Sequence, residues 1–177
     1  MIESLKSKLK GEELNEVLDN LLQQAMIICG TKAGTLHLIN KKNNTLEIAC
    51  SFGLSSDFIE HFKVVNCEDG SVCGRALQKR ETIFIEDLTT DKLFAKHLSL
   101  ALQNSIIAVR STPLISSLDN VIGMISVHFN TPRKLSKNSI EEMEFFCRKA
   151  ADKIEELISY IFFIGLRFTL RFSFSFL

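Results

Sequence analysis

Several features that would assign this 177-residue chain to a common functional class are missing. Lys and Arg together number 21, as do Asp and Glu, so the formal net charge is zero. The long-range positive field that attracts nucleic acids is therefore lacking, and we expect no nucleic-acid partner. The opening segment, MIESLKSKLKGEEL, contains no apolar stretch of signal-peptide length, which predicts a cytoplasmic protein.

The motifs of the common enzyme classes are also missing. The sequence contains no glycine-rich phosphate loop, no Gly-x-Ser-x-Gly turn and no His-Glu-x-x-His motif. Its five cysteines are an odd number, and none belongs to a Cys-x-x-Cys pair. Reduced thiols are therefore expected, and no metal site is predicted.

The most informative stretch that is present covers residues 106–129, IIAVRSTPLISSLDNVIGMISVHF. Two apolar, β-branched runs flank the polar turn at residues 116–120, which predicts a long β-hairpin. Both runs are too apolar for a strand with one wet face, so we place them near the middle of a covered sheet. Alternation puts Arg110 and Thr112 on one face of the first strand, and Ser126 and His128 on one face of the second. Such polar side chains need partners or a ligand.

The remaining elements follow from periodicity and from capping residues. Helical spacing predicts a helix over residues 12–29 and a long final helix with a capping box that starts at Ser139. Ser55 or Ser56 is expected to cap a short helix, and Ser71 a helix that ends near residue 79. Strands are predicted at residues 33–39, 46–52 and 83–85, and further helical segments at residues 91–94 and 97–103.

Both terminal helices carry apolar residues at heptad spacing. In the last helix the pattern comprises Ile140, Met143, Cys147, Ala150, Ile154, Leu157 and Ile161. Such a seam packs either on a helix of a second chain, which would make a homodimer through the terminal helices, or on the domain's own sheet. Residues 158–177 contain no acidic residue and six of the fourteen phenylalanines. Residues 160–166 continue the helix, whereas residues 167–176 alternate as a strand would. The status of this tail is left open.

Four motifs in order resemble those of the GAF domain. They are GSVCGRAL (residues 70–77), FIEDL followed by DKLFAKH (residues 84–97), AVRSTPL (residues 108–114) and IGMISVHF (residues 122–129). Lys92 and Arg110 depart from the family pattern, which usually has proline and an uncharged polar residue there. The resemblance implies an α+β fold related to PAS domains, with α/β/α layers around an antiparallel sheet of five or six strands. We divide the chain into an extension (1–11), a GAF-like domain (12–157) and the tail (158–177).

The resemblance also implies a non-enzymatic sensory or regulatory role in signal transduction. Such a module binds a small molecule, or only dimerises, and signals through its terminal helices to a histidine kinase or other output domain. The ligand is unknown. One enzyme class, the free methionine sulfoxide reductases, shares the fold and uses cysteines at its pocket, so a thiol-dependent reductase is the alternative. No cysteine here is followed by the histidine that accompanies bilin attachment, so no bilin is expected.

Cys73 is the strongest candidate for reactivity. In the first turn of a helix capped by Ser71, and with Arg75 nearby, its thiolate would be favoured. Cys67, six residues upstream, is a candidate disulfide or redox partner. The simpler interpretation, which we favour, is a small packing residue beside Gly74.

Arg110 is the most informative polar residue of the hairpin. A buried guanidinium needs a partner, and either a structural ion pair with Glu86 or Asp87 or a ligand anion would satisfy it. Ser126 and His128 either contact a ligand or bond to each other and to Arg110. Several phenylalanines either line a pocket or belong to the core, and His97 is placed on a surface helix. The candidate ligand-binding set is Phe52, Phe58, Cys73, Arg75, Asp87, Phe94, Arg110, Thr112, Ser126 and His128.

Overall fold

The structure, a computed structural model, describes the backbone of residues 2–173 and the side chains of residues 11–163. In chain order the elements are α1 (Ile2–Cys29), β1 (Ala33–Asn40), β2 (Thr45–Phe52), α2 (Ser56–His61), β3 (Val64–Val65), α3 (Val72–Lys79), β4 (Ile83–Ile85), the 3-10 helix η1 (Leu88–Thr90), α4 (Ala95–Gln103), β5 (Ala108–Ile115), β6 (Val121–Phe129) and α5 (Lys137–Ser173). The predicted α+β fold is confirmed.

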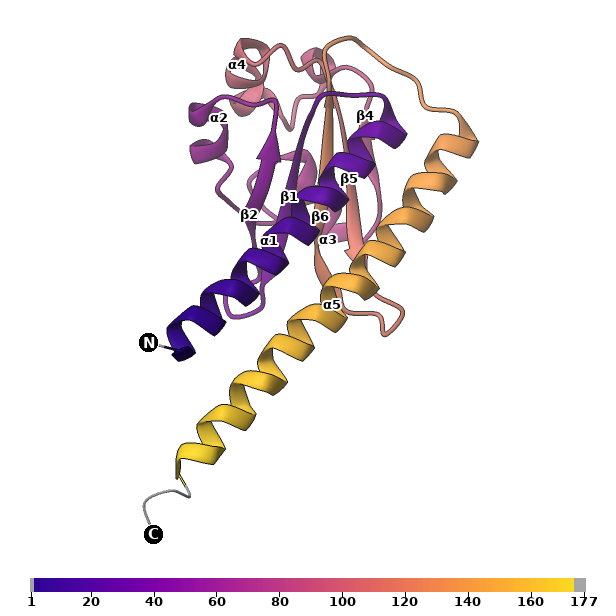
Figure 1. Ribbon diagram of the computed structural model, residues 1–177. Helices are drawn as coiled ribbons and strands as arrows, with labels where there is room; N and C mark the ends of the chain where they lie inside the picture. Colours follow the sequence, from indigo (N-terminus) through magenta and orange to yellow (C-terminus); the bar gives the residue numbers. More distant parts are fainter. Residues whose placement is uncertain (1, 174–177) are drawn as a thin grey trace.

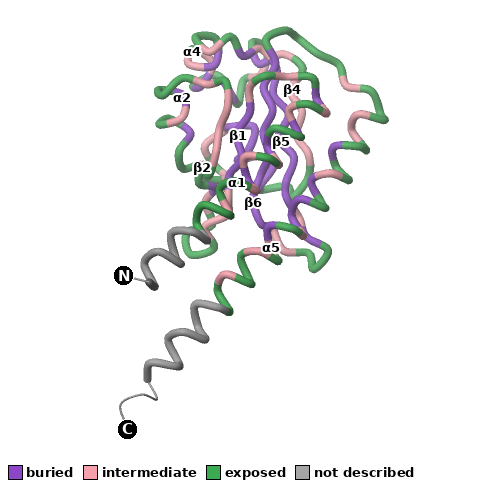
Figure 2. The backbone as a smooth tube through the Cα atoms, viewed as in Figure 1, coloured by how far each residue is buried: buried purple, intermediate pink, exposed green. Residues whose placement is uncertain are grey.

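The strands form one antiparallel six-stranded sheet in the order β3-β2-β1-β6-β5-β4. β6 and β1 are the two central strands, and β5 lies beside β6, as the apolar hairpin predicted. Helices α1 and α5 cover one face of the sheet, and α2, α3 and α4 lie on the other side (Figure 1). The burial of β5 and β6 along nearly their whole length follows from this double cover (Figure 2).

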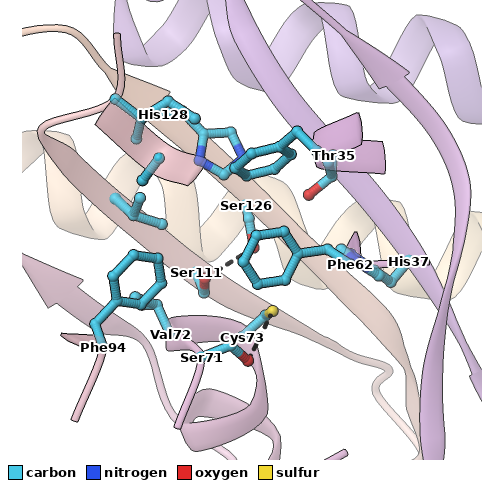
Figure 3. A pocket seen from close by; sticks show the side chains of 14 residues that line it. Thr35, His37, Phe62, Ser71, Val72, Cys73, Phe94, Ser111, Ser126 and His128 are labelled. Atoms are coloured by element: carbon cyan, nitrogen blue, oxygen red, sulfur yellow. Dashed lines mark hydrogen bonds between the residues drawn. The ribbon is translucent and has the colours of Figure 1, made fainter. Parts of the chain in front are cut away.

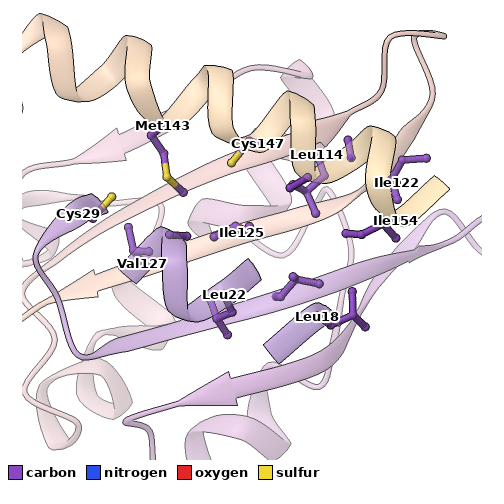
Figure 4. Packing of buried hydrophobic residues seen from close by; sticks show 14 of the residues in the cluster. Leu18, Leu22, Cys29, Leu114, Ile122, Ile125, Val127, Met143, Cys147 and Ile154 are labelled. Carbon is purple, nitrogen blue, oxygen red and sulfur yellow. The ribbon is translucent and has the colours of Figure 1, made fainter. Parts of the chain in front are cut away.

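Each face of the sheet has its own apolar cluster. On the first face, residues of α1 and α5 pack on the sheet and on each other (Figure 4). The buried members from the two helices are Leu18, Leu22, Ala25, Cys29, Met143, Cys147, Ala150, Ala151 and Ile154. The heptad seam of the last helix is therefore used within this chain, which is the second of the two arrangements that its spacing allowed.

Helix boundaries agree with the predicted caps at two places and differ at one. Ser55 and Ser71 cap α2 and α3, because their hydroxyl oxygens accept from the N–H groups of Phe58 and Gly74. The capping box predicted at Ser139 is wrong, since α5 begins one turn earlier and the Ser136 hydroxyl accepts from the Ser139 N–H at 3.2 Å. The sequence alone does not show whether Ser136 or Ser139 caps the helix, because both are followed by residues with helical spacing.

The terminal segments are helical beyond the boundaries that we predicted. α1 begins at Ile2 and α5 continues to Ser173. The strand expected at residues 167–176 is therefore wrong as far as residue 173, and residues 174–177 lie outside the described part of the chain. Among the described residues, no helix combines the length and apolarity that crossing a membrane requires.

Candidate functional site

The candidate site is a small cavity, here called the inner cavity, between the sheet and helices α2, α3 and α4 (Figure 3). Its volume is about 20 Å³, which is room for one or two water molecules. Its wall contains the polar residues Thr35, His37, Ser71, Cys73, Ser111, Ser126 and His128, and the apolar residues Phe58, Phe62, Val72, Phe94, Ala101, Ile106 and Val109.

Strand register produces the polar part of this wall. Ser126 of β6 lies opposite Ser111 of β5 and opposite Thr35 of β1. Directly opposed residues share a face of a sheet, so three hydroxyl side chains form a row across three neighbouring strands. The Ser111 and Ser126 hydroxyl oxygens are 2.8 Å apart and share a hydrogen bond. Pairs of this kind have capacity left to donate or accept one more bond.

Two histidines in the wall lack the hydrogen bonds that burial normally demands. His128 and His37 are 6% and 1% exposed, and their ring nitrogens make no hydrogen bond of normal geometry. A buried polar group without a partner costs about 1–3 kcal/mol, so it usually marks a place for a water or a ligand. Of the two alternatives for His128, hydrogen bonds to Ser126 and Arg110 are therefore not formed.

Burial keeps both imidazoles neutral. It lowers the pKa of His128 to about 3, with a small contribution from His37. It lowers the pKa of His37 to about 4, although the Phe62 backbone and Asp69 oppose the shift. A neutral imidazole has one N–H donor and one acceptor nitrogen. The cavity therefore offers neutral hydrogen-bonding groups rather than charges.

Cys73 lies in this wall as a protonated thiol. Its sulfur is 3.4 Å from the Ser71 hydroxyl, and burial raises its pKa to about 11 despite that contact. Desolvation therefore outweighs the position in the first turn of α3, which we had expected to favour the thiolate. Arg75 was expected to favour the thiolate as well, but its guanidinium pairs with Asp91 at 2.9 Å and does not contribute to the pKa of Cys73. Cys67 and Cys73 are both free thiols.

A pair of histidines links the elements that cover the cavity, which are α2, α4 and the loop before α3. The His97 ring contacts the Asp69 carbonyl through Nε2 at 2.8 Å and the His61 ring through Nδ1 at 2.8 Å. The carbonyl can only accept, so His97 donates from Nε2 and accepts at Nδ1 from the His61 Nε2–H. These bonds join α2, α4 and the loop before α3. His97 is 5% exposed, so its predicted surface position is wrong.

The inner cavity brings together half of the residues that the sequence singled out. Phe58, Cys73, Phe94, Ser126 and His128 line it. The other half lies elsewhere. Phe52 packs at the edge of the cluster under α1, Arg75 pairs with Asp91, and the Asp87 carboxylate accepts from the Thr89 N–H and hydroxyl.

Arg110 and Thr112 lie on the opposite face of the sheet from the cavity. Arg110 is fully buried, and its guanidinium donates to Thr112 Oγ1 at 3.2 Å and to the carbonyls of Ser139 and Ile140 at 3.1 and 3.0 Å. Neither Glu86 nor Asp87 is its partner, so that expectation is wrong. Burial lowers the pKa of Arg110. The side chain fastens β5 to the first turn of α5.

Sequence reasoning missed Thr35, His37, Ser71 and Ser111 as parts of one wall. A polar residue inside an apolar strand was the available signal, and Thr35 and His37 alternate in β1 in the same way as Ser126 and His128 do in β6. The missing information was the register between strands, which decides which alternating sets share a face.

Comparison with known proteins agrees with the fold. A model of the GAF domain family matches residues 11–155, whereas no curated protein matches the chain. Among solved structures, a domain ascribed to a two-component sensor histidine kinase protein of Sinorhizobium meliloti 1021 has a TM-score of 0.67 and 15% identity, covering 80% of this chain and 90% of that one.

Two further structures show how broadly the fold is used. A GAF domain/HD domain protein of Geobacter sulfurreducens has a TM-score of 0.67 and 17% identity, covering 81% of this chain and 93% of that one. The type II free methionine-R-sulfoxide reductase of Thermoplasma acidophilum has a TM-score of 0.60 and 15% identity, covering 80% and 96%. At these identities the likeness concerns the fold alone. The family match covers most of the chain, and this protein belongs to the GAF domain family.

Proposed function

We propose that this GAF domain is a non-enzymatic sensory or regulatory module of the cytoplasm, which binds a small molecule in the inner cavity. The observation that carries the proposal is His128, a buried neutral imidazole whose two nitrogens lack partners at the wall of a cavity. A ligand with a hydrogen-bonding group would satisfy them and recover the cost of their burial.

Strand β6 connects this cavity to the terminal helices. Ser126 and His128 face the cavity, whereas Ile125, Val127 and Phe129 belong to the cluster under α1 and α5. A ligand that displaces β6 changes the packing of both helices. Signalling then requires that the ligand binds more tightly to one helix arrangement than to the other. We propose a histidine kinase or other output domain as the recipient of the signal.

The inner cavity has room for only one or two water molecules, so binding of an organic molecule requires the elements that cover it to move. The His61–His97 bond and the bond from His97 to Asp69 hold α2, α4 and the loop before α3 together. Opening separates these elements, and the free energy of the lost bonds is subtracted from the affinity of the ligand. None of the residues in these bonds belongs to the apolar cluster under α1 and α5.

We also propose that the domain dimerises through the distal part of α5. Among the described side chains beyond Glu155, Ile158 and Phe162 lie about one turn apart on the same face of the helix and are 40% and 70% exposed. The start of α1 and the end of α5 lie at the same end of the domain (Figure 1), where a second copy would add two more helices.

Replacing Phe162 with glutamate should weaken the dimer by about 10-fold or more, because exposed aromatic residues are the usual anchors of an interface. Sedimentation velocity over a concentration series measures this dissociation constant. The control is Lys153→Glu, which adds a negative charge to the same helix about half a turn of rotation away. A wild-type protein that stays monomeric, or equal effects of the two variants, would remove the basis for dimerisation through α5.

The alternative function is a cysteine-based reductase, and the state of Cys73 argues against it. A thiol whose pKa is raised to about 11 by burial is a poor nucleophile at neutral pH. We expect reduction of free methionine sulfoxide to be negligible in the wild type and unchanged in Cys73→Ala. Product formation with a thiol reductant, followed by chromatography, gives the readout. Turnover in the wild type that disappears in Cys73→Ala would establish the reductase instead.

A further inference from the structure

A second, larger pocket lies where β1 begins and β6 ends, and we call it the outer pocket. Its volume is about 350 Å³. His128 and Ile106 line it and also line the inner cavity. These two residues therefore form a shared wall between a small, mostly apolar space and a larger one whose wall contains more polar groups.

The outer pocket carries positive charge that nothing in its wall balances. Its lining includes Lys32 and Arg133 but no aspartate or glutamate. Among the described residues, neither side chain has a hydrogen-bond or ion-pair partner. The other polar groups of the wall are uncharged hydroxyls and amides, which suit an oxyanion because they can donate to it.

Two contacts within the chain favour the position of the Arg133 guanidinium. Its guanidinium carbon is 4.8 Å from the centre of the Phe129 ring, and it lies near Gly30, just beyond the C-terminal end of α1. Cations are favoured at both places. Neither contact uses the N–H donors of the guanidinium, which remain available for a bidentate bond to a carboxylate or phosphate.

His128, which lines both the inner cavity and the outer pocket, is a second sign of a ligand. The Thr31 hydroxyl donates to the His128 carbonyl, which fixes this residue against the turn that carries Lys32. Its ring is more than nine-tenths buried in the wall of the pocket and lacks partners for both nitrogens. The ring is neutral, so it offers an N–H to an anion without adding charge.

We propose that the outer pocket binds a small oxyanion, the carboxylate or phosphate group of a small molecule, between Lys32 and Arg133 with His128 at its inner wall. Because His128 also lines the inner cavity, occupancy of the outer pocket changes the hydrogen bonding of the inner one. The site does not depend on whether the inner cavity itself takes a ligand.

The test is a titration followed by NMR, with sodium acetate and inorganic phosphate as the probes. Chloride is used to hold the ionic strength constant, since screening alone shifts surface signals. The readouts are the backbone amide signals of Lys32, Ser105 and Asn130 and the ring signals of His128. The proteins are the wild type, Lys32→Gln, Arg133→Gln and the control Lys134→Gln, which removes an exposed lysine that does not line the pocket.

We expect saturable shifts in the wild type with a Kd of about 1 mM. Lys32→Gln and Arg133→Gln should each weaken binding by about 10-fold, whereas Lys134→Gln should bind as the wild type does. Saturation by only one of the two probes still supports the site and identifies the head group. The proposal is overturned if neither probe saturates in the wild type, or if all three variants respond alike.

Discussion

Replacing Arg110 with alanine should lower the free energy of unfolding by about 3–5 kcal/mol. The change removes three hydrogen bonds to Thr112, Ser139 and Ile140. It also leaves a cavity between β5 and α5, which the surrounding side chains cannot fill completely. Denaturant unfolding at neutral pH, monitored by circular dichroism, measures the loss.

Arg110→Met separates the contribution of volume from that of the charge. Methionine fills most of the space, and the Ser139 and Ile140 carbonyls lie inside α5, where helix N–H groups remain as partners. Replacing a buried charge by an apolar side chain of similar size is often nearly neutral, so we expect a change within about 1 kcal/mol of the wild type. A methionine variant as unstable as the alanine variant would show that the charge itself holds the strand to the helix.

The domain should lose about 4 kcal/mol of stability when the pH falls from 6.5 to 4.5. The main cause is the lowered pKa of His128 and His37, about 3 and about 4 in the folded chain; burial also lowers the pKa of His97, which acts in the same direction. In this range the unfolded chain takes up a proton on each imidazole, whereas the folded chain does not. Stability therefore rises with pH up to the ordinary histidine pKa and levels off above it. Urea unfolding at several pH values gives the slope.

Single substitutions test whether His128 and His37 cause this loss of stability at acidic pH. Phenylalanine cannot take up a proton, so His128→Phe and His37→Phe should each reduce the loss by about 2 kcal/mol. His128→Phe should also be more stable than the wild type at neutral pH by about 1–2 kcal/mol, because it removes two buried polar atoms that lack partners. An unchanged slope in both variants would mean that other groups cause the acid sensitivity.

Features that depend on a local sequence pattern could be predicted, whereas features that depend on the register between strands could not. Serine caps, the hairpin and the double cover of the sheet follow from residues close together in sequence, as Ser55 and Ser71 illustrate. Alternation also placed Arg110 with Thr112 and Ser126 with His128 correctly. It could not show that these pairs lie on opposite faces, because that depends on the pairing of Ser111 with Ser126 across the turn.

The environment of each candidate residue was harder to predict than its position. Cys73 is in the first turn of α3 as expected, yet burial outweighs the helix and raises its pKa. Arg110 is buried as expected, yet its partners are backbone carbonyls of α5, which no side-chain pairing rule would identify. His97 is covered by α2 and by the loop before α3, which are remote in sequence.

Ligand binding in the inner cavity is most directly tested by native mass spectrometry. The full chain is incubated with a small-molecule extract of its expression host, exchanged into volatile buffer, and weighed before and after denaturation. His128→Phe serves as the comparison, since it keeps the shape of the wall but removes its free nitrogens. The wild type should carry an additional mass that is released on denaturation, and the variant should carry little or none of it. Wild-type and variant proteins that both show only the mass of the bare chain would contradict the sensory function.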